Sequence, residues 1–189
     1  RIREAIRRYG GDMTLLPLAD KELDGALGLV TTVEGVRRPT VSGLLLMGRE
    51  EVIRRYLPAH EVAFQVLEGT DVRVNEFFRK PLLHTFEEFE LLFKARVVEQ
   101  EIQVGLFRVP IPNFDRRAFR EGFINALVHR DYARLGAVHV RLDDDGLTIT
   151  SPGGFIDGVT LQNLLVAPPR SRNPLLADIV VASHFILTN

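Results

Sequence analysis

The stretch REGFINALVHRDY at residues 120–132 is followed by RLDDDGLTITSPGG at residues 141–154. The first stretch has helical periodicity, and the second reads as a β-hairpin that leaves its last strand through a glycine pair. Glu121 and Asn125 are four residues apart, so both side chains project from one face of the expected helix. A carboxylate and an amide one turn apart, followed by a glycine-rich loop, indicate a nucleotide site.

Strand-like and helix-like segments alternate around this stretch. The apolar runs expected to be strands are 41–47, 61–67 and 101–109, and the hairpin takes 138–142 and 147–150 with its turn at Asp145-Gly146. The expected helices are 48–56, 82–100, one capped by Asn113 or Asp115 that runs to about 129, a short one at 160–165, and one opening at Asn173-Pro174. A hairpin among these elements requires antiparallel pairing. We therefore predict an α/β (α+β) fold, a two-layer sandwich with a mixed sheet and helices on one face.

The N-terminal part differs in pattern from the rest. Residues 1–9 are Arg-rich and compatible with a helix, and 15–38 contain scattered apolar residues and glycines typical of weak structure. We expect residues 1–38 to connect from a preceding domain and residues 39–189 to form a nucleotide-binding domain that is incomplete at its C-terminus. The chain reads as a piece of a longer protein.

Composition limits the classes of function. The chain has 46% hydrophobic and 26% charged residues and a formal net charge of -1, so no global field favours nucleic acid. It has no cysteine, which excludes thiolate metal sites and cysteine nucleophiles. No apolar run approaches the roughly 20 residues needed to span a bilayer. We expect a cytoplasmic protein without membrane contact.

Two readings remain open for each candidate residue. Glu121 can polarise a water while the Asn125 amide oxygen binds Mg²⁺, and His129 and Arg130 can reach phosphate one turn on. On spacing alone the structural reading is favoured, in which Glu121 is an exposed acid near a helix start and His129 and Arg130 are cations placed favourably at a helix end.

The segments after the hairpin allow the same two readings. Ser151, Gly153 and Gly154 permit close backbone approach to a ligand or simply form a tight loop. Arg170 and Arg172 precede a helix and can bind an anion, or they lie in an exposed loop. The acids at 143–145 form a solvated hairpin tip.

Taken together, several motifs resemble a known family. The runs EGFINALVHRDY (121–132), VHVRLDDDGLTITSPGGFIDGVTLQNLL (138–165) and RSRNPLLADI (170–179) resemble the RecG-like ATP-binding domain of the GHKL (Bergerat-fold) type. SGLLLMG (42–48) and FEEFELLFKARV (86–97) extend the likeness back to about residue 39. Members follow a Schlafen/Alba-type DNA-binding domain in bacterial and archaeal proteins described as transcriptional regulators or helicase-related.

The resemblance implies roles for individual residues. Glu121 matches the general-base glutamate and Asn125 the Mg²⁺-binding asparagine, so the implied cofactors are ATP and Mg²⁺. SPGG occupies the place of the Asp-x-Gly-x-Gly adenine-binding box, but Ser151 stands where that box has its aspartate. A hydroxyl replaces the carboxylate acceptor for the adenine amino group. The family's glycine-rich lid is not recognisable and is expected beyond Asn189.

These observations lead to one hypothesis and two alternatives. The hypothesis is a GHKL-like nucleotide-binding domain of a RecG-related regulator, in which ATP biases conformation or association and DNA is contacted only through a neighbouring domain. One alternative is a degenerate scaffold or homodimerisation module that has lost nucleotide; the other is a slow ATPase with Glu121 as base. No G-x-x-x-x-G-K-[ST] loop occurs, so a helicase motor is excluded.

Overall fold

The main sheet is four-stranded and mixed. The computed structural model describes residues 2–96, 99–104, 107–112, 115–168 and 170–182. The strand order is β4-β3-β7-β8, in which β3 and β7 run parallel and the two outer pairs run antiparallel. The strands are β3 (Val62–Glu68), β4 (Asp71–Phe78), β7 (Val138–Asp143) and β8 (Gly146–Thr150).

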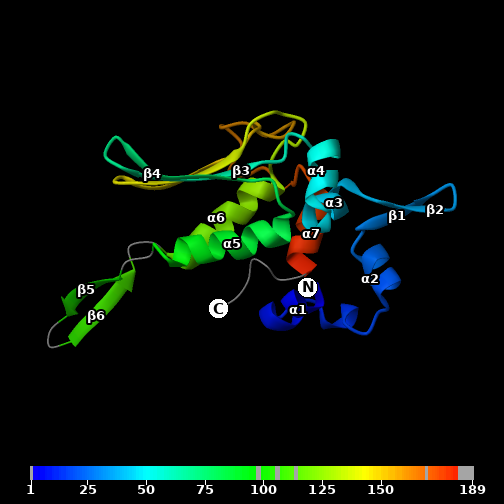
Figure 1. Cartoon of the computed structure of the whole chain (residues 1–189), viewed down its shortest axis with the longest axis horizontal. Coiled ribbons are helices and arrows are strands. Elements are labelled where there is room, and N and C mark those ends of the chain that lie inside the picture. Colours follow the sequence, from blue (N-terminus) through cyan, green and yellow to red (C-terminus); the bar gives the residue numbers. More distant parts are fainter. Residues whose placement is uncertain (1, 97–98, 105–106, 113–114, 169, 183–189) are drawn as a thin grey trace.

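Two helices, α5 (Leu82–Lys94) and α6 (Arg116–Val128), cover one face of this sheet (Figure 1). The strands alternate, so that Phe64 of β3 and Val140 of β7 are buried beneath the helices while Gln65 and Arg141 lie on the opposite face. The predicted two-layer α/β sandwich with a mixed sheet and helices on one face is therefore confirmed.

Aromatic rings fill the space between α5 and α6. The rings of Phe93 and Phe119 stack with centroids 3.8 Å apart, and those of Phe89 and Phe123 stack at 4.6 Å. Phe89 also meets Phe64 of the sheet edge-on at 5.5 Å. The periodic stripe predicted for α5 is confirmed, although the helix ends at Lys94 and the predicted stripe residue Val97 lies outside the described residues.

The N-terminal segment has more structure than its sequence predicted. It contains α1 (Ile2–Tyr9), a 3-10 turn (Met13–Leu15), α2 (Asp20–Ala26) and the hairpin β1 (Val30–Val33) and β2 (Val36–Pro39). Leu23, Leu27 and Leu29 are buried in the same hydrophobic cluster as the sheet and its helices. The prediction of weak structure over 15–38 is therefore wrong. These leucines are buried by tertiary packing, which a local sequence pattern does not reveal. The domain boundary near residue 39 stays a prediction.

The apolar run 41–47 is a helix, not the strand we expected. In α3 (Val41–Met47) the Thr40 hydroxyl accepts a hydrogen bond from the Gly43 amide at 3.0 Å, which caps the first turn. A Cβ on Gly43 would lie 2.2 Å from the Leu29 carbonyl oxygen, so glycine permits the close approach of this helix to the chain before β1. Short apolar runs do not distinguish a buried strand from a buried helix. The next helix, α4 (Glu50–Tyr56), agrees with its prediction.

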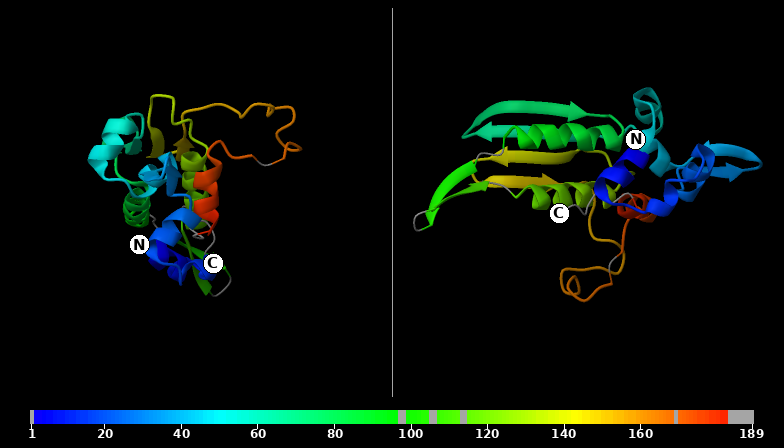
Figure 2. Two further views of the ribbon diagram at one scale, coloured as in Figure 1. Left: turned by 90° about the vertical axis from the view of Figure 1, so that its right-hand side faces the viewer. Right: turned by 90° about the horizontal axis from the view of Figure 1, so that it is seen from below.

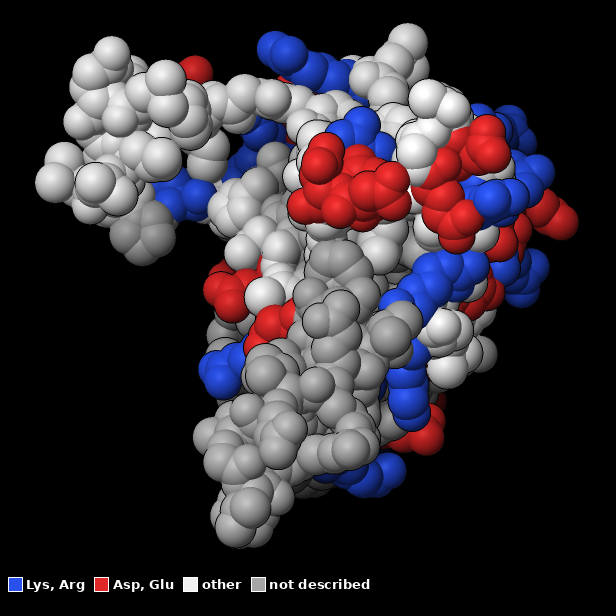
Figure 3. Space-filling view, turned by 90° about the vertical axis from the view of Figure 1, so that its left-hand side faces the viewer, with Lys and Arg blue, Asp and Glu red and all other residues white. Residues whose placement is uncertain are grey.

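A two-stranded arm lies between α5 and α6 in sequence and extends away from the body (Figure 1). Its strands, β5 (Glu99–Val104) and β6 (Phe107–Pro112), pair antiparallel, so the single strand expected over 101–109 was wrong. Pro110 and Pro112 fall within β6, where a strand with one free edge tolerates them. Seen from the side of this arm, acidic and basic side chains are interleaved over the described surface (Figure 3).

Asp143 shapes the turn between β7 and β8. Its carboxylate accepts hydrogen bonds from the amides of Asp145 (3.2 Å) and Gly146 (3.1 Å), and Asp143 pairs with Gly146 in the register. The two turn residues are therefore Asp144 and Asp145, one position before the predicted turn. The Asp144 carboxylate accepts a hydrogen bond from the Gly69 amide at 2.8 Å. This contact agrees with the prediction that the acids at 143–145 form the tip of a hairpin.

A long loop, 151–173, joins β8 to α7 (Pro174–Ala182) and projects from the body (Figure 2). It contains turns where a helix at 160–165 was expected. The Asn163 side chain accepts from the Thr160 amide (2.7 Å) and donates to the Gly158 carbonyl (2.8 Å), which offers the backbone an alternative to helical bonds. The start of α7 after Asn173 agrees with its prediction.

Candidate functional site

Helix α6 carries an exposed polar stripe. Asp115 begins the helix, because its carboxylate accepts from the Ala118 amide at 2.7 Å; the other predicted cap, Asn113, lies outside the described residues. Glu121, Asn125 and His129 follow at intervals of four and are all exposed. The stripe therefore leads along the outside of α6 to its C-terminal end.

The C-terminal end of α6 is bound by residues from three other segments. The last four carbonyls of a helix lack partners within the helix. Here Asn125 accepts from the His129 amide (2.9 Å), Ala126 from the Ser151 hydroxyl (2.7 Å), Leu127 from the Tyr132 hydroxyl (3.1 Å) and Val128 from the Asn173 amide group (2.7 Å). Burial raises the pKa of Tyr132 well above its usual range, which keeps that hydroxyl protonated and available as a donor.

Arg130 lies beneath this end of the helix. Its side chain is fully buried at 0% exposure and donates to the backbone carbonyls of Ala59 and of Gly136, the latter at 2.6 Å. Its guanidinium carbon also lies 4.8 Å from the centre of the Tyr132 ring. Burial lowers the pKa of Arg130, although an arginine with these acceptors stays charged. The guanidinium joins the loop after α6 to the segment before β3 and does not face a surface where phosphate would arrive.

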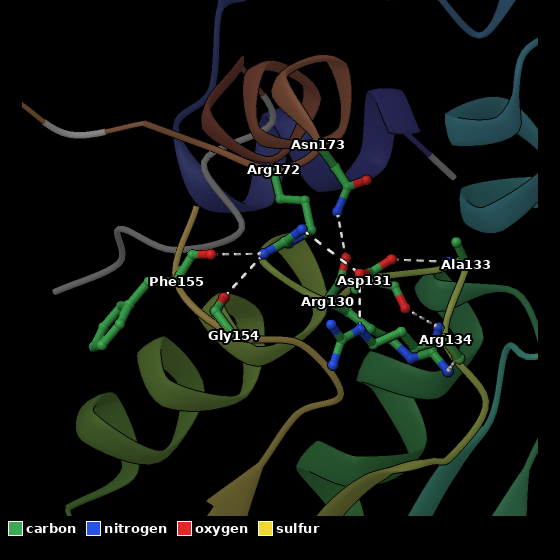
Figure 4. Close-up of polar contacts among 8 residues, drawn as sticks. All are labelled: Arg130, Asp131, Ala133, Arg134, Gly154, Phe155, Arg172 and Asn173. Atoms are coloured by element: carbon green, nitrogen blue, oxygen red, sulfur yellow. Dashed lines mark hydrogen bonds and ion pairs between the residues drawn. The ribbon is translucent and has the colours of Figure 1, made fainter. Parts of the chain in front are cut away.

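Arg172 and Asp131 join the glycine loop to the end of α6 (Figure 4). Arg172 donates to the carbonyls of Gly154 at 2.9 Å and Phe155 at 3.4 Å, and its guanidinium lies 3.6 Å from the Asp131 carboxylate. The Asp131 amide donates to the Pro152 carbonyl at 2.8 Å. The loop is thus held at several points.

A cavity of about 360 Å³ opens between the end of α6 and the loop. That volume lies at the lower end of the range typical of small-molecule sites. Its lining is largely apolar, with two cationic or titratable side chains, and comprises His129, Gly154, Phe155, Ile156, Val159, Leu164, Ala167, Pro168 and Arg170. Among the described residues, the amides of Gly153 and Gly154 have no hydrogen-bond acceptor.

The structure sorts the predicted site residues into three groups. His129, Gly154 and Arg170 line the cavity, with Gly153 beside it. Glu121 and Asn125 lie on the stripe that leads to the cavity, and within the described part of the chain neither side chain has a hydrogen-bond partner. The members of the third group, Ser151, Arg130 and Arg172, bind backbone carbonyls. Their predicted contacts with nucleotide stay predictions.

Sequence reasoning missed Asp131 and Asn173, which connect the parts of the site. Asn173 donates to the carbonyls of Val128 and Arg130 at 2.7 and 2.8 Å, far along the chain from its own position. The only available signal was its place before Pro174, which indicates a helix start but not a second contact. Asp131 follows the helix end without a motif of its own.

Neither a metal cluster nor a membrane span is found in the described ranges. No group of three or more His, Asp or Glu side chains there is arranged to hold a metal ion. None of the described helices combines the length and apolar composition needed to cross a bilayer.

A family model matches residues 136–187. Its description is "Putative ATP-dependent DNA helicase recG C-terminal". The matched segment begins before β7 and contains β8, the loop 151–173 and the described part of α7, but not the stripe on α6. It covers the loop side of the cavity.

A solved structure shares the fold of nearly the whole chain. The crystal structure of the DIP2311 protein from Corynebacterium diphtheriae superposes with a TM-score of 0.75 over 97% of this chain at 24% sequence identity. This chain spans 36% of the length of that protein. No curated protein sequence matches the chain.

Proposed function

We propose that the end of α6 and the loop 151–173 form a nucleotide-binding site for Mg²⁺·ATP. The observation that carries the proposal is the meeting of two features: the exposed Glu121, Asn125 and His129 stripe leads to a cavity walled by the loop. That loop belongs to the segment matched by a RecG-related family model. The match supports an ATPase-like origin for the loop side of the site.

The residues present suit the parts of such a ligand. The apolar wall of the cavity offers a surface for a purine base, and the free amides of Gly153 and Gly154 together with Arg170 offer donors to phosphate oxygens. Mg²⁺ binds few protein ligands and keeps water and phosphate oxygens, so the amide oxygen of Asn125 suffices as a protein ligand. When bound, the ion would neutralise phosphate charge.

Nucleotide binding would bias conformation or association in a regulator whose DNA contacts come from a neighbouring domain. Glu121 is exposed and lies one helical turn before Asn125, which suits a general base that acts on water. We expect any turnover to be slow, because the cavity between α6 and the loop 151–173 is open to solvent.

Calorimetric titration of Mg²⁺·ATP into the full-length protein tests the proposal. We expect saturable binding that EDTA abolishes and that Asn125→Ala weakens by about tenfold or more, as expected for the loss of one metal ligand. Asn75→Ala on β4 is the matched control, since it removes an exposed amide from the far edge of the sheet. Absence of binding to the wild type, or equal affinity in Asn125→Ala, would refute the nucleotide or the Mg²⁺ assignment respectively.

One observation favours the alternative, a scaffold or homodimerisation module. Large apolar side chains at the loop tip are left uncovered: Leu161 is 76%, Val166 83% and Leu165 97% exposed. Exposed apolar patches of this kind often mark interaction sites. Sedimentation of the wild type and of a Leu165→Ser variant distinguishes this function, because only an association through the loop tip depends on Leu165.

A further inference from the structure

We propose that Asp131 and Arg172 act as a positioning pair, hereafter the latch, which holds the glycine loop in the shape that binds the ligand. Arg172 was expected to touch nucleotide; the geometry points instead to an action on the loop. The inference rests on the proposed function for the identity of the ligand, but the latch itself is a property of the unliganded protein.

Arg172 is directed at the backbone of the loop. Its Nη2 atom donates to the carbonyls of Gly154 (2.9 Å) and Phe155 (3.4 Å), while Nη1 lies 3.6 Å from Oδ2 of Asp131. Its side chain is only 26% exposed. A planar guanidinium can bind several acceptors at once, which a single ammonium does less well.

Asp131 holds the other side of the loop. Its amide donates to the Pro152 carbonyl at 2.8 Å, and its Oδ1 accepts from the Ala133 amide at 3.1 Å, which fixes the carboxylate. Gly153 has φ of +136°, and a Cβ built there would lie 3.3 Å from Cβ of Asp131. A glycine therefore allows the loop to approach Asp131 closely.

The latch determines where the loop amides point. In a trans peptide the carbonyl and the next amide point in opposite directions. Because Arg172 binds the Gly154 and Phe155 carbonyls, the amides of Phe155 and Ile156 face away from the guanidinium. Because the Asp131 amide binds the Pro152 carbonyl, the Gly153 amide faces away from Asp131. Glycine-rich loops are otherwise conformationally free, so holding them in advance removes an ordering cost from ligand binding.

Three variants separate the latch from a general loss of structure. Arg172→Gln removes both the positive charge and the planar guanidinium. Arg172→Lys keeps the positive charge without the guanidinium, and Asp131→Asn removes the negative charge of the partner. Arg134→Gln is the matched control: Arg134 also pairs with Oδ2 of Asp131, at 3.3 Å, but its side chain is 67% exposed and it donates to neither loop carbonyl.

The first measurement is amide exchange without nucleotide. We expect the Asp131 amide, which bonds to Pro152, to exchange about tenfold faster in Arg172→Gln, as expected when charge-assisted hydrogen bonds that close the loop are lost. Arg172→Lys should be intermediate, and Arg134→Gln and the Phe123 amide inside α6 should be unchanged. Unchanged Asp131 exchange in both Arg172→Gln and Asp131→Asn would overturn the latch.

The second measurement is the affinity for Mg²⁺·ATP. Arg172→Gln should weaken binding by about tenfold at an unchanged melting temperature, with partial recovery in Arg172→Lys. Faster Asp131 exchange with unchanged affinity would overturn the positioning role. If the wild type binds no Mg²⁺·ATP, the proposed function fails, and Asp131 exchange alone decides whether the latch exists.

Discussion

The two ends of α6 are built on different principles. Near its start, Phe119 and Phe123 stack on the aromatic rings of α5. At its other end, side chains from distant segments bind the last carbonyls, and Arg130 and Arg172 bind backbone oxygens. The hydrophobic driving force that stabilises the first end has no direction, whereas hydrogen bonds are directional and fix positions at a cost in desolvation. The first end, hereafter the aromatic end, should therefore determine the stability of the fold. The second, hereafter the polar end, should determine the geometry of the site.

The largest effect on stability is expected at the aromatic end. Phe123 is 2% exposed and stacks on Phe89, so Phe123→Ala would leave a cavity and lower the free energy of unfolding by about 3–5 kcal/mol. Urea denaturation measures this change. Leu91→Ala, at a position 68% exposed on α5, serves as a control with little expected effect. A loss of less than about 1 kcal/mol in Phe123→Ala would contradict the role given to this end.

A smaller effect is expected from the buried arginine. Arg130→Met keeps an unbranched stem but leaves the Ala59 and Gly136 carbonyls without their donor, which should cost about 1–3 kcal/mol in urea denaturation. Removal of a buried charge acts in the opposite direction, because its desolvation penalty disappears. Stability equal to or above that of the wild type would mean that this penalty dominates and that Arg130 makes no net contribution to stability.

The smallest expected effect on stability is a dependence on pH that arises from His60. His60 is 1% exposed, bonds to the Lys80 carbonyl at 2.8 Å, and lies on the segment that Arg130 holds. Burial lowers the pKa of His60 from its usual value near 6.5, with Arg130 acting in the same direction, although the Lys80 carbonyl and Glu61 oppose the shift.

The unfolded chain then binds more protons than the folded chain below about pH 6.5, so this contribution to stability is lost as pH falls from there toward the folded pKa. Urea denaturation of wild type and His60→Gln at pH 7.5 and 5.5 should show a smaller loss in the variant. Equal losses in the two proteins would place the pH dependence elsewhere.

The sequence was informative where local pattern and packing agree. The α6 cap at Asp115, the α5 stripe, the β7–β8 hairpin and the mixed two-layer sheet were all predicted. The pattern failed at 41–47, where the apolar run forms a helix capped by Thr40 that packs closely against the Leu29 backbone at Gly43. It also failed at 160–165, where the Asn163 side chain replaces helical bonds.

For the candidate site, the sequence indicated residue types but not their targets. The spacing of Glu121, Asn125 and His129 on one helical face follows from helix geometry. That Arg130 is buried and that Arg172 meets Asp131 depends on how the loop returns to the helix end. Such long-range contacts leave no periodic trace in a single sequence.

Hydrogen exchange of the full-length wild type, with and without Mg²⁺·ATP, tests the central claim most directly. Phosphate oxygens would give the Gly153 and Gly154 amides the acceptors they lack among the described residues. We predict that nucleotide protects residues 153–156 and the last turn of α6 and leaves α5 unchanged. No protection at saturating nucleotide, or protection in α5 with none in the loop, would contradict the assignment of function to the polar end of α6.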